Sequence, residues 1–143
     1  MRAFPCTSAK LTMAAEAGRL YTGPTHTYAR RTADALTQGR DGSVTLVLSA
    51  LHGLLTLKQV VEPYDHTWND PGSVTADTLR AQARRLGIAD ADDVVLLTPG
   101  EYTRRALAVW PHARTPLAHL GIGQQRGKLA ALRIRPEQYA TAA

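Results

Sequence analysis

The hydrophobic pattern alternates between short, continuous apolar runs and stretches in which apolar residues recur every three or four positions. Val44–Leu48 and Val94–Thr98 are largely apolar, rich in β-branched residues and bounded by turn residues, so both predict buried strands. Because continuous runs are typical of strands covered on both faces, we expect these two strands to be central, parallel neighbours. Arg2–Pro5 predicts a further short strand.

Helical periodicity fills the segments between these strands. Apolar or small residues with helical spacing predict four helices, over Thr25–Thr37, Thr75–Leu86, Glu101–Trp110 and Gly123–Leu132. In the first helix, the residues with this spacing are Tyr28, Ala29, Thr32, Ala33 and Leu36. Pro24 precedes this helix and Gly39 follows it. Alternation of strands and helices favours an α/β fold: a three-layer sandwich with a mostly parallel central sheet, formed as a single domain over residues 1–143.

The remaining segments carry weaker signals. Leu51–Leu57 predicts a short helix or turn, and Val60–Tyr64 is expected to be extended because the residue before Pro63 avoids the helical region. Pro116–Leu120 predicts a third strand, and His66–Gly72 predicts a turn.

A glycine-rich segment near the end of the chain, Gly121–Lys128, does not have the spacing of a phosphate-binding loop. We interpret it as a glycine hinge that opens a basic helix, whose N-terminus can face an anion.

Composition narrows the class of protein. No apolar run approaches the roughly 18 residues that a membrane-spanning helix needs, and Met1–Cys6 lacks the apolar region of a signal peptide. The single cysteine excludes an intrachain disulfide and leaves too few ligands for a structural zinc site, so we expect a cytoplasmic protein without a metal or cofactor. The net charge of +5 suits phosphate, nucleotide or nucleic-acid partners, or arginines that solvate helix faces.

Candidate chemistry lies where the first long apolar run ends. Directly after that run the chain places five polar residues with catalytic or binding potential, Ser49, His52, Glu62, Tyr64 and Asp65. Ligands of open α/β sheets bind at the carboxyl ends of strands, so this segment predicts a site. The alternative is a strand, a turn and a capped helix whose polar groups satisfy only local hydrogen bonds.

A second candidate segment is the loop Pro5–Lys10, which combines small and hydroxyl residues with a lysine after the first strand. Its free amides and Lys10 can hold an anion, or it is an ordinary loop. Cys6 is a possible nucleophile, but a lone cysteine in a reducing compartment is more often a small buried residue, and we expect a largely buried thiol.

The motifs "PCTSAK", "LYTG" and "LSALHGLL…VVEPYD" occur in this order along the first half of the chain. Together they resemble the YaaA-type peroxide-stress superfamily, with its small actinobacterial and phage relatives. The first motif is also similar to the signature of archaeosine synthase, a tRNA-base-modifying enzyme. The resemblance implies an α/β domain whose motif loops converge on one pocket for a nucleobase, nucleoside or nucleotide.

For such a ligand, the best hypothesis is an N-glycosidase or a base-exchange or base-modifying enzyme. Cleavage at a sugar passes through a cationic transition state that a carboxylate stabilises, which gives candidate catalytic roles to Glu62 or Asp65 and to His52 as an acid or an anchor. The candidate ligand-binding residues provide stacking faces, hydroxyls and a cation: Cys6, Ser8, Lys10, Tyr21, Ser49, Tyr64 and Trp68.

Two other hypotheses use the same residues. In one, the protein is a non-catalytic nucleotide- or nucleic-acid-binding protein of the stress response. In the other, Glu62 and Asp65 only tie down a loop, by capping a helix or pairing with an arginine.

Overall fold

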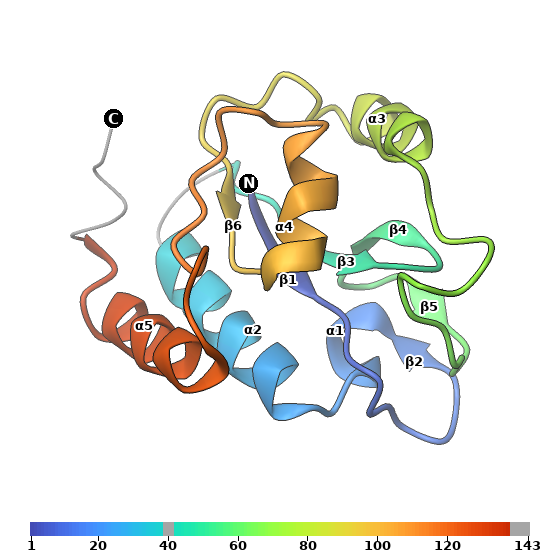
Figure 1. Ribbon diagram of the computed structural model, residues 1–143, viewed down its shortest axis with the longest axis horizontal. Helices are drawn as coiled ribbons and strands as arrows, with labels where there is room; N and C mark the ends of the chain where they lie inside the picture. Colours follow the sequence, from blue (N-terminus) through green and yellow to red (C-terminus); the bar gives the residue numbers. More distant parts are fainter. Residues whose placement is uncertain (39–41, 138–143) are drawn as a thin grey trace.

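The computed structural model describes residues 1–38 and 42–137. Its main sheet is mixed, with the strand order β4-β3-β1-β6 (Figure 1). The central strand β1 (Arg2–Pro5) pairs in parallel with β3 (Thr45–Ser49) on one side and with β6 (Val95–Leu96) on the other. The chain thus forms a mixed α/β domain.

The expectation that the two long apolar runs are adjacent strands is wrong. Both runs form strands, but β1 lies between them and is parallel to each, and β6 stands at one end of the strand order rather than at its centre. Every residue of β1 is buried, including Arg2, whose guanidinium pairs with the carboxylate of Asp93 at 3.1 Å. Hydrophobicity indicates which strands are buried, but it carries no information on their order in a sheet.

The segment expected to be a short helix or turn, Leu51–Leu57, instead contains strand β4 (Gly53–Thr56), which pairs antiparallel with β3. Gly53 adopts a φ of 75°, and this left-handed conformation lets the chain reverse directly after β3. A short apolar run does not distinguish a strand from a buried helical turn, which explains the error.

A second small sheet consists of β2 (Ala15–Glu16) and β5 (Val60–Val61), paired antiparallel. The prediction of a third strand over Pro116–Leu120 is wrong, because these residues form a turn. Shortly before this turn, a parallel bridge pairs Arg114 with Val95 of the main sheet.

The expected helices are confirmed with small shifts at their ends. They are α2 (Pro24–Thr37), α3 (Ala76–Arg85), α4 (Gly100–Leu107) and α5 (Ile122–Ile134), and a short helix α1 (Ala17–Leu20) was not anticipated. The hydroxyl of Thr75 accepts the amide hydrogen of Thr78 and so caps α3. Gly39, expected to end the first helix, lies outside the described residues.

Two hydrophobic clusters lie on opposite faces of the main sheet. Phe4, Val47 and Val95 pack with residues of α2 and α5 in one cluster. Their sequence neighbours Ala3, Leu46 and Leu96 pack with residues of α3 and α4 in the other. Successive strand residues point to opposite faces, so both faces of the sheet are buried.

Across residues 1–38 and 42–137, no helix is both long enough and apolar enough to span a membrane.

Candidate functional site

The ends of the parallel strands bring together the loops that the sequence singled out. β1 is followed directly by Cys6 and the loop to Lys10, and β3 ends at Ser49, in register with this end of β1. Two cavities open here rather than the single one expected. We call them the tryptophan cavity and the histidine cavity after Trp68 and His52.

The tryptophan cavity has a volume of about 380 Å³, within the range of small-molecule sites. The first loop contributes Cys6, Thr7 and Ser8, the segment after Asp65 contributes His66, Thr67, Trp68 and Asn69, and α4 contributes Glu101 and Tyr102. Of the expected ligand-binding residues, Cys6, Ser8 and Trp68 therefore share one cavity.

The histidine cavity has a volume of about 400 Å³. It is lined by Leu51 and His52 from the turn after β3 and by Gln59, Val60, Val61, Glu62, Pro63 and Tyr64. Two of the three expected catalytic residues, His52 and Glu62, lie here together with Tyr64. The third, Asp65, lines neither cavity.

Tyr64 lines the histidine cavity, and a chain of hydroxyl groups holds it in place. The hydroxyl of Ser49 accepts hydrogen bonds from the backbone amides of Leu51 and His52, at 3.2 and 3.1 Å. With both lone pairs used, this hydroxyl donates its own hydrogen to Tyr64, at 2.6 Å. Tyr64 then donates to the hydroxyl of Tyr21, at 2.7 Å. Ser49 and Tyr21, both expected to bind ligand, are buried and fix the position of Tyr64.

Lys10 and His52 both contact the ring of Tyr64. The Lys10 ammonium lies 4.4 Å from the ring centroid, a cation–π contact, and the imidazole of His52 meets the ring edge to face at 4.9 Å. Lys10 and His52 thus meet at one ring, and Glu62 lines the same cavity as His52, whereas Lys10 lines neither cavity. The face of Tyr64 that was expected to stack on a base is occupied by Lys10.

Burial sets the protonation states of this group. It lowers the pKa of His52, with nearby His66 lowering it further, so the imidazole is neutral at pH 7. Burial raises the pKa of Tyr21 to about 12 and also raises the pKa of Tyr64. All three groups are therefore uncharged, and Lys10 is the cation of the cluster.

Trp68 is a wall of the tryptophan cavity rather than a free stacking face. Its indole is 9% exposed, meets the ring of Tyr102 edge to face at 5.3 Å and lies 5.1 Å from the guanidinium of Arg105. Its Nε1 hydrogen has no acceptor among the residues that the structure describes. A buried N–H without an acceptor is uncommon.

Cys6 is confirmed as a buried thiol, with 6% of its surface exposed. Its Sγ lies 3.2 Å from the hydroxyl of Tyr102, and the two groups share a hydrogen bond. Burial, followed by the proximity of Cys6, raises the pKa of Tyr102. Cys6 thus links the first loop to α4 at the floor of the cavity.

The carboxylates differ in how firmly they are held. Glu62 and Asp65 are exposed, and neither forms a hydrogen bond or ion pair within the described part of the chain. Glu101, which sequence reasoning missed, lines the tryptophan cavity and bonds to the guanidiniums of Arg104 and Arg105, at 2.6 and 3.2 Å. Hydrogen bonding from Arg104 is the largest effect that lowers the pKa of Glu101.

Glu101 and Tyr102 lie in the first turn of α4, shortly after the second apolar run. This position in the sequence could have identified them as candidate site residues. The strand-end rule that selected Ser49 and His52 applies equally to this position.

Among residues 1–38 and 42–137, no group of three or more His, Cys, Asp or Glu side chains is arranged to hold a metal ion.

One protein-family model, described as a family of unknown function (DUF6884), matches residues 4–131. The matched segment contains every residue of both cavities. A search of curated proteins found no match.

Proposed function

This chain belongs to the DUF6884 family, and we propose that it acts on a nucleobase-containing small molecule as an N-glycosidase or base-exchange enzyme. The observation that carries the proposal is the cluster of Lys10, Tyr64 and His52 at the strand ends. One cavity beside this cluster offers aromatic walls and hydroxyls, and the other offers a carboxylate and an imidazole.

In the proposed complex, the base occupies the tryptophan cavity. Trp68 and Tyr102 supply planar walls for the base. The exposed hydroxyl of Ser8 and the ammonium of Lys10 then contact sugar or phosphate oxygens. The Lys10 ammonium donates a hydrogen bond to the backbone carbonyl of Ser8 at 3.2 Å, so the two side chains lie on the same loop.

Hydrolysis breaks the bond between the anomeric carbon and the base nitrogen, and water adds to that carbon. Glu62 is proposed to stabilise the cationic transition state or to accept the proton of the attacking water. The base nitrogen leaves with the electron pair of the broken bond and takes a proton from solvent, while His52, neutral at pH 7 and lining the same cavity as Glu62, anchors the sugar. In base exchange, a second base takes the place of water.

Incubation with a panel of nucleosides and nucleotides, followed by chromatography for free base, tests this reaction. Glu62→Gln is expected to remove most turnover while it largely spares ligand binding, because the lost charge matters mainly in the transition state. Asp65→Asn is the matched control, since Asp65 is also exposed but lines neither cavity. If both variants release base like the parent, the assigned carboxylate role is wrong.

A non-catalytic role is the second candidate, and the freedom of the carboxylates favours it. Catalytic groups are normally held by packing and supporting hydrogen bonds, whereas Glu62 is exposed and unsupported in the described part of the chain. In this case the cavities bind a nucleotide, or a nucleic acid, in a stress response without turnover. Binding without release of base in the same panel would select this alternative.

We also propose that the fold is a three-layer sandwich on a mostly parallel sheet, in a cytoplasmic protein related to the YaaA-type superfamily. The two clusters on opposite sides of the strands and the two parallel pairings of β1 support this architecture. The motif order supports the relationship.

A further inference from the structure

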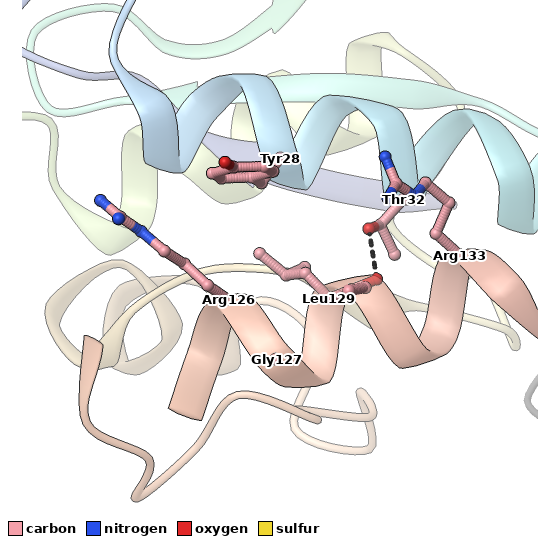
Figure 2. Close-up of a pocket in the computed structure, with 7 residues that line it drawn as sticks. Tyr28, Thr32, Arg126, Gly127, Leu129 and Arg133 are labelled. Carbon is pink, nitrogen blue, oxygen red and sulfur yellow. Dashed lines mark hydrogen bonds between the residues drawn. The ribbon is translucent and has the colours of Figure 1, made fainter. Parts of the chain in front are cut away.

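A third cavity lies away from the candidate site, between α2 and α5, with a volume of about 290 Å³ (Figure 2). Its walls are Tyr28 and Thr32 of α2 and Arg126, Gly127, Leu129, Ala130 and Arg133 of α5. None of these residues lines the tryptophan or histidine cavity. The two helices are locked together beneath it, because the hydroxyl of Thr32 donates to the carbonyl of Leu129 at 2.8 Å.

Two exposed arginines flank this groove. Arg126 and Arg133 lie two turns apart on the same face of α5, about 10 Å along the helix axis, and both reach toward α2 (Figure 2). Neither arginine has a carboxylate partner in the described part of the chain. No residue of α5 is acidic, so the positive charge of this groove is uncompensated by the helix that bears it.

Tyr28 places an aromatic ring between these charges. The sequence pattern assigned it to the buried face of its helix, but its side chain is 40% exposed, while Ala29, Thr32, Ala33 and Leu36 are buried. The guanidinium of Arg126 lies 5.8 Å from the ring centroid. This exposed ring lies beside guanidiniums that have no carboxylate partner in the described part of the chain, and it offers a surface for stacking.

We infer that the groove formed by Tyr28, Arg126 and Arg133 binds single-stranded nucleic acid. Proteins that bind single strands without sequence preference combine a positively charged groove for the backbone with aromatic rings for the bases. Arg126 and Arg133 are too far apart along the helix to share one phosphate group easily, so they contact different phosphates of one strand. A base stacks on Tyr28 between them.

The groove suits a nucleic acid better than a protein partner. Its floor, Leu129, is already buried, and its exposed groups are mainly one ring and two guanidiniums. The core of a protein interface requires more apolar area and fewer unpaired charges. The inference does not depend on the proposed glycosidase activity, although α2 begins beside the candidate site, where the Gly23 amide donates to the Thr7 hydroxyl at 3.3 Å.

Fluorescence anisotropy with labelled oligothymidylate and oligouridylate of about 12 nucleotides tests the inference on the full chain, between about 50 and 200 mM salt. The double variant Arg126→Gln/Arg133→Gln is expected to weaken binding and to flatten the slope of log affinity against log salt by about 1.4, since each phosphate contact contributes about 0.7. Tyr28→Leu keeps the charge and is expected to lower affinity about fivefold or more through loss of stacking.

Arg84→Gln/Arg85→Gln is the matched control. It removes the same two charges from an exposed part of α3, well away from α5 (Figure 1). If this control weakens binding as much as the groove variant does, binding follows only the net charge and the inference is wrong. It is also wrong if neither oligonucleotide binds, or if thymidine 5′-monophosphate binds as tightly as the oligonucleotides, which would identify a site for free nucleotides.

Discussion

His26 is a buried titratable group whose protonation should make the stability of the fold depend on pH. It lies in α2 between the rings of Phe4 and Tyr21 and is 2% exposed. Its Nδ1 lies 2.8 Å from the carbonyl oxygen of Pro5, which can only accept, so Nδ1 carries the hydrogen. The Nε2 atom has no partner among the described residues, and a proton added there would be buried without an acceptor.

Burial is the largest cause that lowers the pKa of His26, from 6.5 to about 4. Because the folded pKa is depressed, the folded state favours the neutral imidazole. The resulting stability is fully present above about pH 6.5 and is lost as the pH falls toward 4. The slope within this window is about 1.4 kcal/mol per pH unit, so the free energy of unfolding should fall by about 2.5 kcal/mol between pH 7 and pH 4.5 from this residue alone.

Urea unfolding followed by tryptophan fluorescence at these two pH values measures this contribution. His26→Gln should abolish the fall attributed to His26, whatever its effect on stability at pH 7. His112→Gln, which alters an exposed histidine, should keep the parental pH dependence. An equal loss of stability on acidification in the parent and in His26→Gln would refute the reasoning.

Three further predictions concern single groups. Tyr64→Phe removes two buried hydroxyl bonds and should lower the free energy of unfolding by about 2 kcal/mol in urea titrations; a change below about 0.5 kcal/mol would show that the hydroxyl chain does not form. Gly53→Ala should lower the melting temperature more than Gly87→Ala, because both positions have a φ above 70° but only the first new methyl group collides with Gln82; equal shifts would contradict this. Cys6→Ser should leave base release mostly intact, and a loss of activity, or rapid alkylation of the thiol, would indicate covalent catalysis instead.

Sequence reasoning was most reliable where one local signal decides the structure. The helix α3 has a hydroxyl cap at Thr75 and apolar spacing through Leu79 and Ala83, and it was placed within one residue. Strand order, in contrast, depends on which strands meet across the whole chain. Arg2 shows the difficulty, because its burial relies on Asp93, a partner 91 positions away.

The same distinction applies to the candidate site. The strand-end rule selected Ser49, His52 and Tyr64, which do lie together. The rule did not distinguish residues that face a cavity from residues that hold a cavity-lining side chain in place. Ser49 belongs to the second kind, because it is buried and bonded to Tyr64, and this contact depends on tertiary packing. The same rule could have selected Tyr102, because this residue follows the second apolar run.

A crystal structure of the protein soaked with a nucleoside monophosphate at millimolar concentration shows whether the cavities at the strand ends bind a nucleotide. We expect density for the base against Trp68 and Tyr102 and for the sugar or phosphate beside Lys10. Density for the ligand only elsewhere, or cavities that stay empty at that concentration for every nucleotide of the panel, would contradict this expectation.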